Sequence, residues 1–143
     1  MNYEFLEDIA IADIAFQASG NTLEEVFQVS GDATINAMIE NIEEIQPKET
    51  RNFHIENDEL DLLLFNFLQE LIYYKDSELL LLRTQEIKIY EENGQHQLNA
   101  VMIGEKLDRD RHEQRVDVKA VTLHRFKLEK TAEGWTALVI LDI

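Results

Sequence analysis

The chain has 143 residues, of which 45% are hydrophobic and 29% are charged, a composition typical of one globular domain and not of a disordered chain. It contains no Cys, which excludes disulfides and thiolate chemistry, and no apolar run close to the roughly 20 residues of a membrane span. With 13 Lys and Arg against 29 Asp and Glu, the formal net charge is -16. This charge disfavours direct binding of RNA and fits either a basic protein partner or simple solubility.

No basic segment followed by an apolar stretch begins the chain, so no secretory signal is indicated. We therefore expect a single cytoplasmic domain spanning residues 1–143, without membrane contact. The sequence leaves the oligomeric state open.

The first part of the chain predicts two strands and a helix. Alternating apolar residues indicate strands over residues 3–6 and 11–18. Thr22-Leu23-Glu24-Glu25 is a capping box, in which the Thr22 hydroxyl can accept from the Glu25 N–H. Apolar residues then recur at spacings of three, four and seven up to Ile45, which predicts a helix that Pro47 ends.

The next segments predict a short strand and a helix that is apolar on most sides. Gly31, on the apolar stripe of the first helix, marks either close packing or a break. A short strand fits residues 52–56, and Asp58 is the expected cap of a second helix that runs to about Tyr74. Its Leu and Phe residues indicate burial in a core and not a cofactor site.

The second half of the chain predicts an antiparallel meander. Strands are expected over 79–91 and 97–104, joined by the hairpin signal Glu92-Asn93-Gly94-Gln95, and over 116–130 and 135–142. Strands joined by tight turns are antiparallel. The predicted fold class is α+β, with two main helices packed on one side of a mostly antiparallel β-sheet.

Two acidic residues stand at the ends of apolar segments. Asp142 follows Leu138 and Ile140 on the last strand, and the chain closes on Ile143, which brings an α-carboxylate to the same point. If Asp13 lies alongside, its carboxylate, the Asp142 carboxylate and that of Ile143 would repel one another unless a hard cation such as Ca²⁺ or Mn²⁺ sat between them. The alternative is that Asp142 only ends a strand and Asp13 caps a turn.

The segment 104–112 is a charged turn with several chemically active side chains. Glu105, Asp108 and His112 could act as ligands or as a proton relay. The favoured interpretation is a solvated turn with local ion pairs, each worth less than about 1 kcal/mol.

Two further residues in the strand over 116–130 carry chemistry. His124 stands on the apolar face of that strand, where a half-buried structural role is the better interpretation. Lys119, on the polar face, either contacts a phosphate or is solvated. The sequence contains no Gly-rich phosphate loop, HExxH or GxSxG, so catalysis by this chain alone is poorly supported.

Taken together, these segments resemble the archease family over nearly the whole chain. The resemblance rests on their order as well as their content: Tyr3–Leu6 with Ala12-Asp13, Thr22-Leu23-Glu24-Glu25, Leu62–Asp76, the GE-x-x-D-x-x-R-H pattern at 104–112, Val118–Thr122 with His124, Gly134-Trp135, and Asp142-Ile143.

The resemblance implies an accessory protein and not an enzyme. Archeases promote an RtcB-type RNA ligase in tRNA splicing and RNA repair, helping guanylylation with GTP, allowing multiple turnover and broadening nucleotide use, so that tRNA or other RNA is a partner only indirectly. The family's divalent-metal site falls on Asp13, Asp142 and the carboxylate of Ile143, with Ca²⁺ or Mn²⁺ as the expected ion.

Three departures from the family pattern stand out. Ala10-Ile11 replace the usual His-Thr next to the metal ligand, Leu123 replaces a Tyr, and Asp32 interrupts an apolar stretch of the first helix. The alternative functions are a metal-independent chaperone-like adaptor, a direct RNA-binding protein, which the charge disfavours, and a metal-dependent hydrolase.

Overall fold

The computed structural model describes residues 2–7 and 13–143. Within these residues, two α-helices, a short 3₁₀ helix and seven strands follow one another. Their order is β1 (Tyr3–Leu6), β2 (Ile14–Gly20), α1 (Leu23–Met38), η1 (Ile42–Glu44), β3 (Glu49–Asn57), α2 (Leu60–Glu78), β4 (Leu80–Glu92), β5 (Gln95–Lys106), β6 (Ala120–Thr131) and β7 (Gly134–Asp142).

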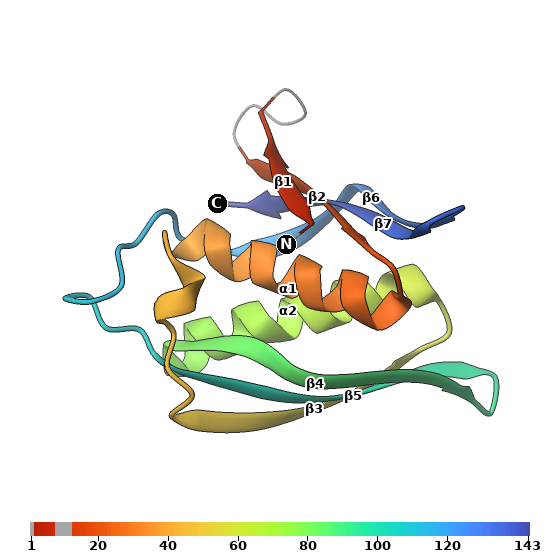
Figure 1. Ribbon diagram of the computed structural model, residues 1–143, viewed down its shortest axis with the longest axis horizontal. Helices are drawn as coiled ribbons and strands as arrows, with labels where there is room; N and C mark the ends of the chain where they lie inside the picture. Colours follow the sequence, from red (N-terminus) through yellow and green to blue (C-terminus); the bar gives the residue numbers. More distant parts are fainter. Residues whose placement is uncertain (1, 8–12) are drawn as a thin grey trace.

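The helices lie between two antiparallel sheets (Figure 1). One sheet has the order β1-β2-β7-β6 and the other β3-β5-β4, and each helix contacts strands of both. The α+β class is confirmed, but the expectation of one sheet with both helices on one side is wrong. Alternation in a strand shows that one face is buried without showing which sheet it belongs to, whereas helices apolar on most sides need cover on two sides.

Helix α1 begins as predicted and ends earlier. The Glu25 N–H donates to Thr22 Oγ1 at 3.1 Å, which confirms the cap. The helix ends at Met38 and not near Ile45, because residues 115–116 supply N–H donors to its last carbonyls, Arg115 to Met38 O at 2.8 Å and the next residue to Ala37 O at 3.3 Å.

Gly31 marks close packing and not a break. It lies inside the uninterrupted helix α1, and a Cβ there would stand 3.2 Å from Leu71 Cδ1 and 3.4 Å from Phe67 Cε2 of helix α2. The absent side chain lets the two helices approach each other. The buried core between the sheets includes aromatic side chains from several elements, among them Phe16, Phe27, Phe53 and Phe67.

Helix α2 is longer than expected and begins one residue later. Its cap is Glu59 and not Asp58, and the Glu59 N–H is satisfied by the Asn57 side chain at 3.0 Å. It continues past Tyr74 to Glu78 and closes on Leu79, which has the left-handed φ of 55°.

The strands follow the sequence pattern with two exceptions. The strand over residues 3–6 and the hairpin are confirmed, with Asn93 at φ 55° and the following glycine at φ 79° in the turn. The strand predicted over residues 11–18 covers Ile14–Gly20 in the structure, and residues 11–12 lie outside the described residues. Strand β6 begins at Ala120 and not at 116, and its pairing with β7 is interrupted between Thr122 and Lys127 by a bulge.

Candidate functional site

The acidic end of the molecule is assembled by the pairing of β2 with β7. Ile14 pairs with Leu141 at the last step of this antiparallel register. Asp13 directly precedes Ile14 and Asp142 directly follows Leu141, so the same register, continued by one residue on each strand, would set these two aspartates opposite each other. On the other side of β7, Ala120 pairs with Asp142, and the Lys119 N–H donates to Asp142 O at 2.8 Å. Residues from three neighbouring segments therefore meet at this end of the sheet.

The side chains at this end are accessible and have not used their hydrogen-bonding capacity. Asp142 is exposed, while Asp13 and Ile143 are half-buried, and Ile143 packs against the hydrophobic core. Within residues 2–7 and 13–143, neither aspartate side chain has a hydrogen bond or an ion pair. An arrangement of this kind leaves the carboxylate oxygens available to an external cation.

The donor set suits a hard divalent ion only if the α-carboxylate takes part. In the described part of the chain, no three His, Cys, Asp or Glu side chains converge in a way that could hold a metal. Two aspartates and the Ile143 carboxylate would supply the oxygen-only ligation that Ca²⁺ and Mn²⁺ favour. The His-Thr replacement at Ala10-Ile11 lies outside the described residues.

The charged turn at 104–112 is held at its two ends by a buried network. Glu105 is 3% exposed and His112 is 2% exposed. Glu105 Oε2 lies 3.0 Å from His112 Nε2 and accepts from the Gln46 N–H at 2.9 Å, while its other oxygen pairs with Arg111. The favoured sequence interpretation is therefore wrong for Glu105 and His112, which are buried, whereas residues 106 and 108–110 are exposed, as expected of a solvated turn.

Every polar atom of this network has a partner, and the pattern assigns the imidazole tautomer. The Asp108 N–H donates to His112 Nδ1 at 2.9 Å, so Nδ1 is the acceptor and Nε2 carries the hydrogen donated to Glu105. Burial by itself raises the pKa of Glu105, but hydrogen bonds from Arg111, the Gln46 N–H and His112 outweigh it and lower the pKa to about 2. This network of Glu105, Arg111, His112 and the Gln46 N–H holds the loop after β5 in place, and we call it the clasp.

The three remaining predicted site residues, Asp108, Lys119 and His124, are all exposed. The Asp108 side chain is exposed, accepts from the Asp110 N–H at 3.0 Å and lies 3.8 Å from Arg111 Nε, so both its backbone and its carboxylate contact the network. Lys119 is exposed and lies next to Asp142. His124 is exposed in the β6 bulge, where Arg125 has φ 55°, so the expected half-buried role is wrong.

A buried lysine escaped the sequence analysis. Lys75 of α2 is 7% exposed, and its Nζ donates to Asp117 Oδ1 and to Val118 O, each at 2.8 Å. Burial lowers the pKa of Lys75, but the hydrogen bonds and charges of Asp117 and Asp76 raise it more. Lys75 thereby anchors the segment that leads to Lys119. The signal in the sequence was a charged residue in an otherwise apolar helix face.

A second buried ion pair accounts for one departure from the family pattern. Asp32 in α1 is 3% exposed and accepts from Arg83 through both oxygens, at 3.2 Å and 3.0 Å. Hydrogen bonding and charge from Asp32 raise the pKa of Arg83. The acid in the apolar stretch is therefore compensated by a cation from strand β4.

With this geometry in place, comparison with known proteins identifies the family. The pattern of the archease protein family matches residues 3–143. The chain belongs to the archease family. It is 38% identical over 133 residues to the protein archease of Pyrococcus abyssi, covering 92% of this chain and 93% of that one. It is 37% identical over 142 residues to the protein archease of Methanosarcina mazei, covering 99% and 95%.

Solved structures share the archease fold. Protein 1598 of Methanobacterium thermoautotrophicum, known from a solution structure, matches with a TM-score of 0.86 and 31% identity over 99% of each chain. A crystal structure of an archease from Thermotoga maritima, described as a possible chaperone, matches with a TM-score of 0.65 and 20% identity, covering 94% of this chain and 93% of that one. In the described part of this archease, no helix is long and apolar enough to cross a membrane.

Proposed function

We propose that this archease is an accessory protein of an RtcB-type RNA ligase. It promotes guanylylation of the ligase with GTP and multiple turnover in tRNA splicing and RNA repair, and it is not itself an enzyme. Family membership over residues 3–143 supports the assignment. The observation that supports the mechanism is the β2–β7 register, whose last pair, Ile14 with Leu141, lies directly beside Asp13 and Asp142.

Asp13, Asp142 and the carboxylate of Ile143 would hold a divalent ion, Ca²⁺ or Mn²⁺. Bound there, the ion would supply positive charge to phosphate oxygens of a nucleotide. The chain's own residues fix the geometry of the end. The core packing of Ile143 and the 2.8 Å bond from the Lys119 N–H to Asp142 O hold the last residues in place. Lys119, which is exposed beside this end, would pair with an anion on the partner.

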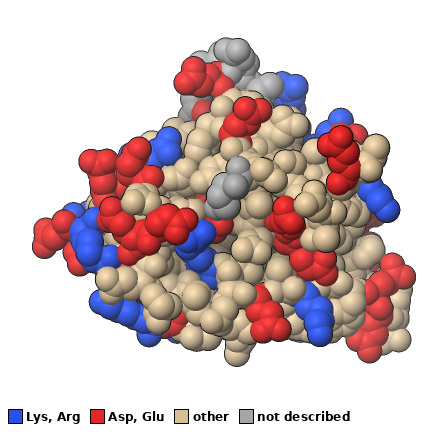
Figure 2. Space-filling model, viewed as in Figure 1, with Lys and Arg blue, Asp and Glu red and all other residues tan. Residues whose placement is uncertain are grey.

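The surface charge supports a basic protein partner. The net charge is -16, and on the face seen in Figure 2 the acidic side chains gather in several groups with Lys and Arg beside them. A surface of this sign is steered toward a basic cleft, such as one that binds nucleotide and RNA phosphates. RNA would then be met only through the ligase.

The test is single-turnover guanylylation of the cognate ligase with and without this protein. Asp13→Asn and Asp142→Asn should abolish stimulation while the circular dichroism spectrum stays unchanged. Glu133→Gln is the matched control, because it removes one negative charge in the turn that precedes β7, at the strand's opposite end. No stimulation by the unmodified protein would reject the proposal. Full stimulation by both Asn variants would instead favour a metal-independent, chaperone-like adaptor.

A further inference from the structure

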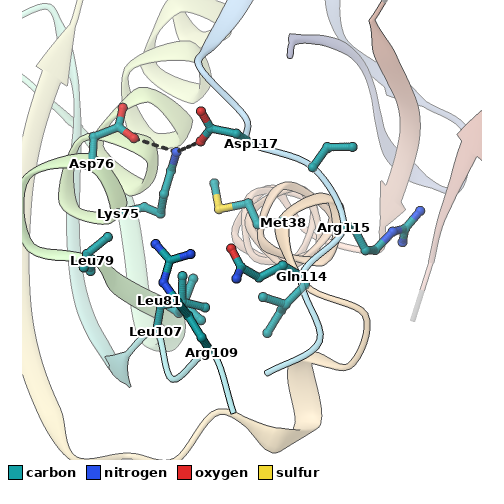
Figure 3. A pocket seen from close by; sticks show the side chains of 12 residues that line it. Met38, Lys75, Asp76, Leu79, Leu81, Leu107, Arg109, Gln114, Arg115 and Asp117 are labelled. Atoms are coloured by element: carbon teal, nitrogen blue, oxygen red, sulfur yellow. Dashed lines mark hydrogen bonds and ion pairs between the residues drawn. The ribbon is translucent and has the colours of Figure 1, made fainter. Parts of the chain in front are cut away.

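A pocket distinct from the acidic end lies where the two helices finish. It has a volume of about 380 Å³ and is formed by the C-terminal ends of α1 and α2, the start of β4 and the segment 107–117 (Figure 3). This volume is in the range of small-molecule sites in proteins, about 300–1,000 Å³. The apolar part of its lining consists of Met38, Ile39, Leu79, Leu81, Leu107 and Val116.

Two of the three basic side chains at the pocket are already engaged. The Lys75 ammonium is bound by Asp76, by Asp117 and by the Val118 carbonyl, which together account for its three donors (Figure 3). The Arg115 guanidinium is turned away from the pocket, toward Asn36 O at 3.2 Å and the Phe5 ring at 5.1 Å. Neither is available to a ligand in the pocket.

Two other polar groups line the pocket with their donors unused. Arg109 and Gln114 enter from the two ends of the segment 107–117, and their polar ends turn toward the middle of the pocket (Figure 3). Within residues 2–7 and 13–143, neither side chain takes part in a hydrogen bond or an ion pair. Both residues are exposed, and a guanidinium fork and an amide NH₂ are donors that suit a planar anionic group.

The rim of the pocket restricts the charge that this anion can carry. The carboxylates of Asp76 and Asp117 are 54% and 74% exposed at their side chains and share one cation, Lys75, so together the three groups leave one net negative charge at the entrance. This charge and the net charge of -16 repel a dianion such as phosphate more strongly than a monoanion. A monoanion with an apolar body meets one charge at Arg109 and apolar surface beneath it.

An exposed leucine at the rim extends the apolar surface. Leu79 is 48% exposed and is held in the left-handed region at φ 55°, with its carbonyl accepting from the Leu107 N–H at 2.7 Å. A side chain of this kind loses contact with water when an apolar group covers it. The pocket therefore offers apolar contact at both its floor and its edge.

We propose that this pocket binds a small amphipathic carboxylate, with its carboxylate on Arg109 and Gln114 and an aliphatic body on Met38, Leu81 and Val116. The same chemistry is present in a free carboxylic acid and in the C-terminal residue of a peptide that ends in leucine. This site does not depend on the ligase or on a metal ion.

The experiment is an NMR titration of the ¹⁵N-labelled full chain. N-acetyl-leucine is compared with its neutral carboxamide, with inorganic phosphate, and with an N-acetylated tetrapeptide ending in Leu-Leu with a free carboxylate. The proposal expects saturable shifts at the Gln114 side-chain NH₂ and the backbone of 107–117, and binding at least about tenfold weaker for the carboxamide and for phosphate, the scale of a lost charged hydrogen bond. Tighter binding of the peptide assigns the ligand to a protein terminus, and tighter binding of N-acetyl-leucine assigns it to a free acid.

Two matched variants make the result decisive. Arg109→Gln should weaken N-acetyl-leucine at least about tenfold, whereas Arg125→Gln, the same change at an exposed arginine in the β6 bulge, should leave it unaltered. The proposal is overturned by shifts that do not saturate or lie outside the pocket, by equal binding of acid and carboxamide, or by equal effects of the two arginine variants.

Discussion

Two acidic regions of the molecule use their carboxylates in opposite ways. Glu105 is 3% exposed, and its two oxygens accept from a guanidinium, an imidazole and a backbone N–H. Asp142 is exposed, directly follows the Leu141 that pairs with Ile14 of β2, and has no side-chain partner in the described residues. A carboxylate whose capacity is filled by the protein stabilises the fold, whereas converging carboxylates left unfilled are available to a ligand.

The largest predicted effect is the loss of stability when the buried acid Glu105 is removed. Glu105→Ala leaves Arg111 without its partner and leaves the His112 and Gln46 N–H groups unsatisfied, so the free energy of unfolding should fall by about 4 kcal/mol. Urea denaturation measures it. Glu129→Ala, at an exposed residue paired with Lys127 at 3.2 Å, is the control and should change stability by less than about 0.5 kcal/mol. Equal losses in the two variants would contradict a clasp at Glu105.

The second predicted effect is the stabilisation of the folded protein by a cation that binds the exposed acids. Because a cation that binds only the folded state stabilises it, Ca²⁺ at about a hundred times its dissociation constant should raise the free energy of unfolding by about 2.7 kcal/mol. Asp142→Asn should remove this gain, while Glu105→Gln should retain it. Thermal denaturation with and without Ca²⁺ tests both, and a gain that survives in Asp142→Asn would place the cation elsewhere.

A third effect is the pH dependence of the clasp. The pKa of Glu105 is lowered from 4.5 to about 2, so the unfolded chain binds this proton more tightly than the folded one. The stabilisation is fully present above about pH 4.5 and is lost as the pH falls toward 2. Wild type should lose about 2 kcal/mol more than Glu105→Gln between about pH 7 and pH 3. If the stabilities of the two proteins fell in parallel with pH, Glu105 would not be the source of the pH-dependent loss.

The smallest effect is also diagnostic. In the absence of divalent cations, Asp142→Asn removes an exposed charge without a partner, so stability should change by less than about 0.5 kcal/mol, with relief of repulsion from Asp13 favouring a slight increase. Chemical denaturation in chelator measures it. A loss above about 2 kcal/mol would mean that Asp142 belongs to the fold in the same way as Glu105.

Local signals in the sequence predicted most elements, and long-range contacts set the rest. The Thr22 cap and the Asn93-Gly94 turn are encoded within a few residues, and both were predicted correctly. The end of α1 was not, because it is imposed by residues 115–116, which are remote in sequence. The division into two sheets likewise depends on which strands each helix covers, and a strand's alternation does not specify this.

The two acidic regions differed in how far the sequence could describe them. The sequence placed Asp13 and Asp142 at the ends of two apolar strands, and the β2–β7 register brings their neighbours Ile14 and Leu141 together, while a shared cation stays a prediction. The burial of Glu105 and His112 could not be, because a charged turn has the composition of a solvated loop and its closing contact, the Gln46 N–H, is 59 residues away. The exposure of His124 follows from a bulge, which ordinary strand alternation does not reveal.

The most direct measurement follows paramagnetic broadening by Mn²⁺ in the ¹H–¹⁵N spectrum of the full chain. If Asp13, Asp142 and the Ile143 carboxylate share one cation, substoichiometric Mn²⁺ should first broaden the amides of residues 13–15, 119–120 and 141–143, and leave those of Glu105 and His112 sharp. Asp142→Asn should abolish this pattern. Broadening centred on Glu105, or spread evenly over the acidic surface, would contradict a shared cation at the end of β7.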